Sequence, residues 1–170
     1  MSVVFIGLGS NIGDRVGYVQ QAHKLLSDTA GINIINSSSL YETEPYGYKD
    51  QEWFVNAVVQ LETTLEPHQL LEVCQRIEKQ LGRIRHPEAP QWGPRTVDLD
   101  LLLYDDLIIA DDRLQIPHPG LHQRAYALVP LLELEPDLLH PVLRKSVLDV
   151  HSELPEPEEV YLYGTRRLDL

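Results

Sequence analysis

Residues 92–104 read WGPRTVDLDLLLY and carry the clearest structural signal in the chain. From residue 95 to residue 104, apolar and polar side chains alternate with a period of two, which predicts a β-strand with one buried face. The predicted buried face consists of Val97, Leu99, Leu101 and Leu103. Asp98 and Asp100 share the opposite face, about 6.6 Å apart, because each strand residue rises about 3.3 Å.

This pair of carboxylates suits a metal site. Two oxygen ligands on one face can converge on one hard cation or on two. Mg²⁺ fits the pair better than Zn²⁺, because no cluster of Cys or His lies nearby in the sequence. The alternative is a solvated strand face with alternating charge, and the spacing of the two aspartates alone leaves both interpretations open.

The segment just before this strand is basic. Within residues 76–95, five cationic side chains outnumber two acidic ones and give a net charge of +3, from Arg76, Lys79, Arg83, Arg85 and Arg95 against Glu78 and Glu88. The planar guanidinium group suits phosphate oxygens, and arginines beside a carboxylate-bound Mg²⁺ are the parts that phosphoryl transfer requires. The alternative is that these arginines pair with acidic side chains elsewhere on the surface.

The composition of the whole chain limits the class of protein. Its 170 residues are 43% apolar, which is enough for one domain with one core. A formal net charge of -12 argues against a nucleic-acid binder, which needs a basic face. The single cysteine, Cys74, cannot form an internal disulfide, and no apolar run is long enough to span a bilayer. With no positively charged leader, we expect a cytoplasmic protein without membrane or nucleic-acid partners.

Around the central stretch, apolar periodicity and Gly/Pro punctuation predict the order strand, helix, strand, strand, helix, strand. The predicted strands cover residues 3–9, 32–42, 53–62 and 95–104, and the predicted helices cover 14–30 and 67–81. The second helix has its cap near Thr63 or Thr64 and ends at Gly82. This order matches a split βαβ arrangement, in which an antiparallel or mixed sheet packs its helices on one face. The predicted fold class is α+β.

The C-terminal part gives weaker signals. Ile108 and Ile109 predict a short strand, and residues 121–134 predict a helix that Pro130 bends or interrupts. A last helix is predicted over 143–150. The tail from residue 152 is rich in Glu and Pro before a short apolar VYLY, so it is either a loose appendage or an added edge strand.

Two further motifs have a simple structural interpretation. The segment GLGSNIGD, residues 7–14, lacks both the GxGxxG spacing and the lysine of a P-loop, so it predicts a tight turn at the border of a site. His118 and His122 have the spacing of a metal pair on a helix. Pro119 and Gly120 between them argue against a continuous helix, and therefore against a zinc site.

Several separated motifs, taken together, resemble one family. They are GLGSN, FVNAV, QRIEKQLGRIR, WGPRTVDLDLLLY and IPHPGLHQRAYALVPLLEL, in this order along the chain. The combination resembles 6-hydroxymethyl-7,8-dihydropterin pyrophosphokinase from about residue 3 to residue 150. The resemblance implies a ferredoxin-like α+β sandwich with a mainly antiparallel sheet. It also divides the chain into a pyrophosphokinase domain, residues 1–150, and a C-terminal extension of unknown role, residues 151–170.

The resemblance implies an activity in folate biosynthesis. Pyrophosphate would pass from ATP to the hydroxymethyl oxygen of 6-hydroxymethyl-7,8-dihydropterin, with release of AMP and without a covalent nucleophile. Asp98 and Asp100 would hold two Mg²⁺ ions that bridge the triphosphate. Arg83 and Arg95 would stabilise the charge of the phosphates during transfer.

The resemblance also implies two sets of binding residues. ATP would be contacted by Glu78, Arg85, Trp92, Leu101, Arg113, His118 and Arg124. The pterin would be bound by Thr43, Glu44, Tyr46, Phe54, Asn56 and Tyr126. In the second set, Phe54 and Tyr126 would stack on the flat ring and Asn56 would pair with its edge. Judged by residue type alone, the two aromatic side chains are equally typical of a core.

Alternatives to this activity remain open. One is another Mg²⁺-dependent phosphoryl or nucleotidyl transferase that uses the same two aspartates, and the other is a catalytically silent binding module of the same fold. For the enzyme, the loops at residues 43–52 and 83–94 are expected to close over the substrates and exclude water. The sequence shows no apolar interaction stripe, so we expect a monomer.

Overall fold

A six-stranded sheet forms the centre of the computed structural model, which describes residues 1–47, 49–82 and 96–166. The strands run in the order β5-β1-β4-β3-β8, with β2 also paired to β4, and every pairing is antiparallel. Their bounds are β1 (Ser2–Ser10), β2 (Ile32–Ser37), β3 (Tyr41–Thr43), β4 (Phe54–Thr63), β5 (Asp98–Tyr104) and β8 (Val160–Leu162). The predicted α+β class is confirmed.

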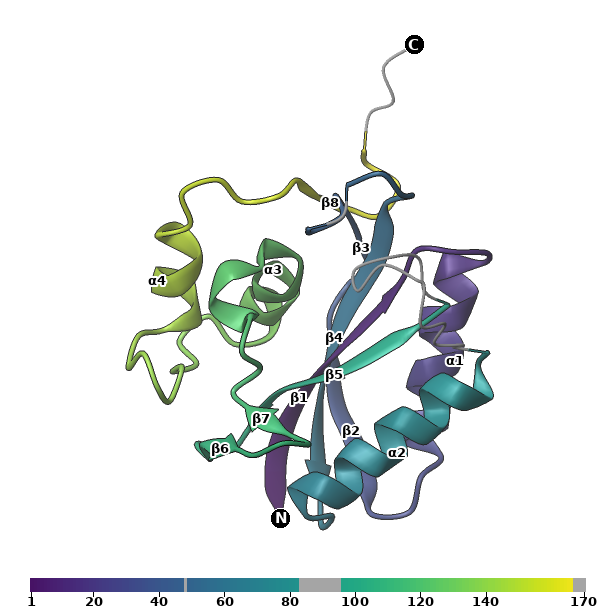
Figure 1. Cartoon of the computed structure of the whole chain (residues 1–170), viewed down its shortest axis with the longest axis vertical. Coiled ribbons are helices and arrows are strands. Elements are labelled where there is room, and N and C mark those ends of the chain that lie inside the picture. Colours follow the sequence, from purple (N-terminus) through teal and green to yellow (C-terminus); the bar gives the residue numbers. More distant parts are fainter. Residues whose placement is uncertain (48, 83–95, 167–170) are drawn as a thin grey trace.

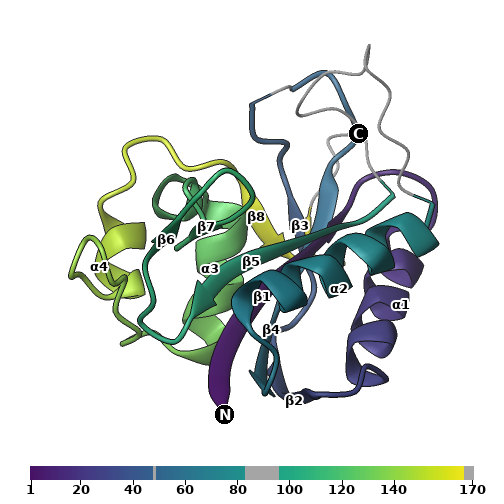
Figure 2. The same cartoon turned by 60° about the horizontal axis from the view of Figure 1, so that its bottom comes forward.

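Helices cover both faces of this sheet, whereas the sequence predicted helices on one face (Figures 1 and 2). The longer pair on one side is α1 (Arg15–Ser27) and α2 (Pro67–Gln80). The other side carries α3 (Ala125–Leu134), the short α4 (Val147–Ser152), a 3-10 turn η1 (Leu121–Gln123) and a small hairpin of β6 (Ile109–Ala110) and β7 (Gln115–Ile116). The order strand, helix, strand, strand, helix, strand described only the first of these two layers.

The sheet therefore separates two apolar cores. Alternate residues of β1 serve each one: Val4, Ile6 and Leu8 belong to the core under α1 and α2, and Phe5 belongs to the core under α3 and α4. The predicted core position of Cys74 is confirmed, since the side chain is only 1% exposed in the α1/α2 core. On the α3 side, the positions that follow Phe5 are glycines and leave space above the sheet.

A β-bulge divides β5 between the two cores. Its pairing with β1 shifts by one residue where Ile6 faces Leu101 and Phe5 faces Leu103, so Leu102 is an extra residue. Val97, Leu99 and Leu101 pack in the α1/α2 core as predicted. Leu103 was predicted on the same face and instead packs beside Leu102 in the α3/α4 core, because the bulge reverses the alternation after Leu101.

Other boundaries differ from the prediction for local reasons. The single strand predicted over 32–42 is two strands, β2 and β3, that pair with successive parts of β4. Between them, the N–H of Ser38 still donates to the carbonyl of Val58, but the N–H of Val58 donates to the Ser38 hydroxyl. The cap of α2 is Glu66, not Thr63 or Thr64. Thr63 instead donates its hydroxyl to the carbonyl of Gly31.

The C-terminal half also departs from the prediction. The helix predicted over 121–134 breaks at Arg124, between η1 and α3, and Pro130 lies inside α3. The last helix begins at Val147 instead of residue 143. The tail forms β8 beside β3, so the edge-strand alternative is the correct one. None of the helices in the described ranges is both long and apolar enough to cross a membrane.

Candidate active site

Two adjoining cavities lie at the end of the sheet where β1 and β5 carry small and acidic residues. The first, of about 300 Å³, lies between the α3 face of the sheet and α3. The second, of about 320 Å³, lies on the β7 side of β5. Asp100, His118 and Pro119 line both cavities, so the two share one wall.

The floor of the first cavity is open because two of its residues are glycines. Gly7 and Gly9 of β1 line it, at the positions where alternation would otherwise place bulky residues on the α3 side. Gly9 is paired with Asn56 of β4, whose amide Nδ2 donates to the Thr43 hydroxyl at 2.7 Å. A Cβ on Gly9 would collide with the Asn56 Oδ1, so a glycine is needed for this amide to lie across the strand.

The two predicted metal ligands both face the first cavity. Asp98 is 9% exposed and Asp100 is partly exposed, and both line the cavity from β5. Between them, the N–H of Leu99 points away from β1 and donates to the buried Glu78 carboxylate at 2.9 Å. Glu78 of α2 therefore fixes the strand at the residue that separates the two aspartates.

His118 is held at the shared wall as a neutral imidazole. Its backbone N–H donates to the carbonyl of Leu102 at 3.0 Å, and its Nδ1 accepts the N–H of Gly120 at 3.2 Å. Burial, aided by the nearby positive charge of Arg124 and opposed by Asp98, lowers the pKa of His118 to about 4. With Nδ1 used as an acceptor, the proton lies on Nε2, which makes that nitrogen a donor.

Arg124 lies against two aromatic rings of the first cavity. Its guanidinium carbon is 5.3 Å from the ring centroid of Tyr46 and 5.9 Å from that of Tyr126, and its NH1 donates to the Tyr126 hydroxyl at 3.1 Å. A Cβ on Gly120 would collide with the guanidinium, so this glycine makes room for Arg124. Burial is the main reason why the pKa of Tyr126 is raised, so its hydroxyl stays protonated.

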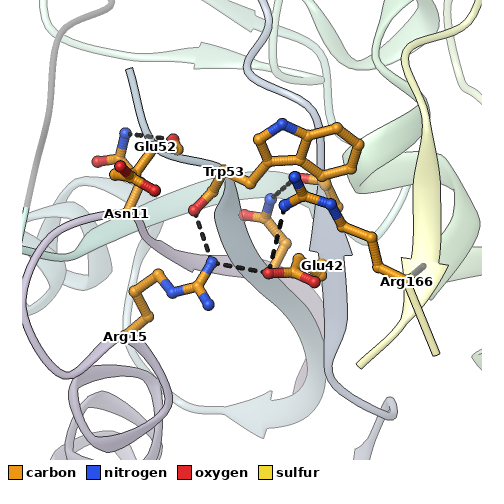
Figure 3. A network of polar contacts seen from close by, with 8 residues as sticks. Asn11, Arg15, Glu42, Glu52, Trp53 and Arg166 are labelled. Atoms are coloured by element: carbon orange, nitrogen blue, oxygen red, sulfur yellow. Dashed lines mark hydrogen bonds and ion pairs between the residues drawn. The ribbon is translucent and has the colours of Figure 1, made fainter. Parts of the chain in front are cut away.

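A polar network around Glu42 and Trp53 anchors the end of the loop that joins β3 to β4 (Figure 3). Arg15 donates both to Glu42 at 3.1 Å and to the carbonyl of Trp53 at 2.9 Å. Arg166 forms an ion pair with the same carboxylate at 3.6 Å and lies over the Trp53 ring. On the other side, the Asn11 amide donates to the carbonyl of Glu52 at 3.1 Å. The network thus joins α1, β3, this loop and the C-terminal tail.

The amino-acid sequence matches a known protein family over most of its length. The model of the 7,8-dihydro-6-hydroxymethylpterin-pyrophosphokinase family matches residues 5–136. The chain belongs to this family. The resemblance seen in the sequence is confirmed, and the chain is an enzyme of the pyrophosphokinase class.

Relatives of this pyrophosphokinase include proteins of similar length and much longer ones. The 2-amino-4-hydroxy-6-hydroxymethyldihydropteridine pyrophosphokinase of Methylorubrum extorquens is 46% identical over 139 residues, which are 82% of this chain and 86% of the relative. That of Bacillus subtilis is 46% identical over 133 residues, 78% of each chain. The folic acid synthesis protein fol1 of Schizosaccharomyces pombe is 41% identical over 163 residues, which are 96% of this chain but 22% of that protein.

Solved structures support the fold of the pyrophosphokinase. The Plasmodium falciparum HPPK-DHPS wild type with STZ-DHP superposes with a TM-score of 0.71 at 16% identity, over 89% of this chain and 43% of that one. Another structure, of HPPK-DHPS in complex with substrates, gives a TM-score of 0.69 at 14% identity, over 89% of this chain and 43% of that chain. At these identities the likeness concerns the fold alone, and it agrees with the predicted ferredoxin-like α+β sandwich.

The structure brings most of the predicted site residues of this pyrophosphokinase together. All six residues predicted to bind the pterin line the first cavity: Thr43, Glu44, Tyr46, Phe54, Asn56 and Tyr126. Four other predicted residues line it too: Asp98, Asp100, His118 and Arg124. Leu101 and Arg113, predicted to contact ATP, line the second cavity.

The remaining five predicted residues fall into two groups. Glu78 is only 6% exposed and lines neither cavity, since its carboxylate is bound to the backbone of β5. Arg83, Arg85, Trp92 and Arg95 lie outside the described residues.

Sequence reasoning missed Gly9 and Gly120 as residues that shape the pocket. The strand-interior glycines of GLGSN were the only available signal for the first, because a glycine inside a strand often marks close approach of another group.

Proposed function

We propose that this pyrophosphokinase transfers the β,γ-pyrophosphoryl group of ATP to the hydroxymethyl oxygen of 6-hydroxymethyl-7,8-dihydropterin and releases AMP. The observation that carries the proposal is the pair of adjoining cavities with Asp100 and His118 in their common wall. One cavity has aromatic walls and a side-chain amide, and the other has an arginine and acidic residues at its rim. Two different substrates could thus meet at one group of polar side chains.

The first cavity has the properties of a pterin site. Phe54 and Tyr126 provide aromatic surface for a flat ring, and Asn56 offers both an amide donor and an acceptor for the ring edge. The hydrogen bond from Asn56 Nδ2 to Thr43 fixes which way the amide is turned. Backbone groups of Thr43, Glu44 and Tyr46 would complete the recognition of the ring.

The second cavity would receive the nucleotide. Arg113 at its rim is paired only loosely, through an exposed contact of 3.3 Å to Glu72, so its guanidinium can turn to a phosphate at low cost. Leu101 supplies apolar surface in the same cavity. Of the ATP residues outside the described ranges, we propose that Trp92 and Arg85 bind the nucleotide and that Arg83 and Arg95 stabilise the phosphate charge.

The donor set on β5 fits Mg²⁺. No group of three or more His, Cys, Asp or Glu that could hold a metal occurs among the described residues, so this part of the chain alone offers no complete cage. Mg²⁺ commonly binds through one or two carboxylates together with substrate phosphates and water, and two aspartates suffice for that. Asp98 and Asp100 would hold two ions, which when bound would neutralise the triphosphate and orient the β-phosphorus.

His118 of the shared wall and Arg124 of the first cavity would then assist transfer by position and charge. Neutral His118 would donate its Nε2 proton in a hydrogen bond to a phosphate oxygen, without a proton transfer. Arg124 would add positive charge on the side of Tyr126. The loops at residues 43–52 and 83–94 would close over the substrates and exclude water, which is testable by hydrogen exchange with an ATP analogue and pterin bound.

One assay tests this function directly. The wild type is incubated with ATP, Mg²⁺ and 6-hydroxymethyl-7,8-dihydropterin, and AMP is measured for it and for Asp98→Ala, Asp100→Ala and Asp106→Ala. We expect the first two variants to lose at least about 100-fold in rate. The exposed Asp106, just beyond β5, is the matched control and should retain wild-type activity. Equal AMP release by all four proteins would refute the role of the two aspartates.

The nature of the product separates the alternatives. A simple kinase that used the same aspartates would release ADP, a nucleotidyl transferase would release pyrophosphate, and a silent binding module would release neither of these nor AMP. The cytoplasmic location and the monomeric state stay predictions, and light scattering of the purified protein checks the second.

A further inference from the structure

The C-terminal tail places a carboxylate at the start of α3. Glu158 is only 7% exposed, and its Oε1 accepts the backbone N–H of Tyr126 at 2.7 Å. The first N–H groups of a helix have no partner within it, and Arg124, the cap residue of α3, makes no capping hydrogen bond with its side chain. A carboxylate also interacts favourably with the positive end of the helix dipole. Glu158 therefore supplies, from 32 residues away, what the local sequence of α3 does not.

The neighbouring tail residues hold the opposite wall of the first cavity. The N–H of Glu44 donates to the Glu159 carbonyl at 2.9 Å, and the N–H of Glu159 donates to the Glu44 carboxylate at 3.0 Å. One residue further, Val160 pairs with Thr43 in the β3–β8 ladder. Three consecutive tail residues thus contact three residues that line the cavity, on both of its sides. Glu158 itself does not line the cavity.

From this bridge we propose that Glu158 is a positioning residue for the pterin site. Its carboxylate fixes the backbone at Tyr126, and so the distance between the aromatic ring on α3 and the β3 side of the cavity. The inference rests on the proposed function, because it assumes that Tyr126 contacts the pterin. It assigns a role to the extension beyond residue 150, namely to set the width of the substrate pocket.

The test uses three single variants of the full chain. Glu158→Ala removes the acceptor, Glu158→Gln keeps one acceptor oxygen without the charge, and Glu156→Ala changes an exposed glutamate two residues earlier. We expect Glu158→Ala to raise the KM for the pterin about tenfold, with the KM for ATP within about twofold of the wild type. Glu158→Gln should raise it about threefold or less, and Glu156→Ala should leave both constants unchanged.

A double variant shows whether Glu158 acts through the aromatic ring. If it does, Tyr126→Ala combined with Glu158→Ala should bind the pterin no more weakly than Tyr126→Ala alone, because the ring to be positioned is already gone. Additive losses would overturn the proposal. It would also be overturned if Glu158→Ala lowered the melting temperature and left both KM values unchanged, since the carboxylate would then only stabilise the helix. If Glu158→Ala does not fold, the same comparison is made with Glu158→Gln.

The outcomes for the two proposals are distinguishable. A wild-type chain that releases no AMP with the pterin contradicts the proposed function itself. A wild type that is active, with Glu158 variants that match it in the KM for the pterin, contradicts only the positioning role.

Discussion

The α-carbon of Gly9 lies directly against the side-chain amide of Asn56, its partner across the β1–β4 ladder. A methyl group in its place would collide with Asn56 Oδ1 and would lie 3.8 Å from the Phe54 ring. The same amide is held on its other side by the Thr43 hydroxyl. The orientation of the proposed pterin-binding amide thus depends both on the lack of a side chain at Gly9 and on the hydroxyl of Thr43.

Gly9→Ala is therefore expected to impair binding of the pterin. Because Asn56 is held by Thr43, it cannot move away freely, and we expect the KM for the pterin to rise about tenfold or more while the KM for ATP changes little. Gly7→Ala is the comparison, since its methyl group would meet Leu102 at an ordinary contact distance of 3.6 Å and should have a smaller effect. Steady-state kinetics with each substrate varied in turn measures both. If Gly9→Ala kept wild-type constants, the amide would not bind the ring.

The contact between Glu78 and the backbone of Leu99 makes a second prediction. Glu78→Ala leaves a buried N–H without its acceptor, which should lower the free energy of unfolding by about 1–3 kcal/mol. Because that N–H lies between Asp98 and Asp100, the Mg²⁺ concentration required for half-maximal activity should rise as well. Glu78→Gln, which keeps an acceptor oxygen, should restore most of both quantities. If the two variants behaved alike, the negative charge would matter more than the hydrogen bond.

Arg113 allows the two cavities to be separated by experiment. It lines only the second one, and its ion pair with Glu72 is exposed, so Arg113→Ala should change the free energy of unfolding by no more than about 0.5 kcal/mol. The KM for ATP should rise about fivefold to tenfold and the KM for the pterin should stay within about twofold. A rise in the pterin constant instead would mean that the substrates occupy the cavities in the opposite arrangement.

Glu44 gives a prediction about pH. The N–H of Glu159 and, next in importance, the ion pair with Lys49 hold the pKa of Glu44 below its usual 4.5. A carboxyl whose pKa is lowered in the folded state stabilises the fold above its usual pKa, and this contribution is lost as the pH falls through the lowered value. At about pH 7, the free energy of unfolding of Glu44→Gln, measured by urea denaturation, should therefore be lower than that of the wild type by a few tenths to about 1 kcal/mol.

At about pH 3.5 the difference between Glu44→Gln and the wild type should shrink, because the wild-type carboxyl is then largely protonated in the unfolded state and increasingly so in the native one. The exposed Glu156, changed to Gln, serves as the control and should show no difference at either pH. A gap between Glu44→Gln and the wild type that stayed constant with pH would assign the effect to packing and not to charge.

The sequence predicted those parts of the site that depend on periodicity. The alternation around Asp98 and Asp100 correctly placed both carboxylates on the face opposite Leu99, because side-chain direction in a strand follows from position alone. The bulge at Leu102 was not predictable in this way. Residues 101–103 are all leucines, so the apolar pattern does not show which of them is the extra residue. The position of the bulge follows from packing: Leu101 contacts the α1/α2 core, whereas Leu102 and Leu103 contact the α3/α4 core.

Long-range contacts account for most of the remaining differences. The tail was equally compatible with a loose segment, because its pairing with β3 depends on backbone groups and carries no residue signature. The role of Glu158 likewise depends on where Tyr126 lies in space. In the same way, the hydrogen bond from the backbone of β5 to the Glu78 carboxylate has no signature in the sequence, while the contact of Glu78 with ATP that the resemblance implies stays a prediction.

The wall that the two cavities share has a consequence for inhibitor design. A compound that extended from one cavity into the other would have to pass the shared wall, which contains Asp100 and His118. Substitutions of Asp100 or His118 that weakened binding of the compound would also change residues on which turnover is proposed to depend. Substitutions that give resistance to such a compound should therefore lie at the outer ends of the cavities, where each one removes only a small share of the compound's contacts.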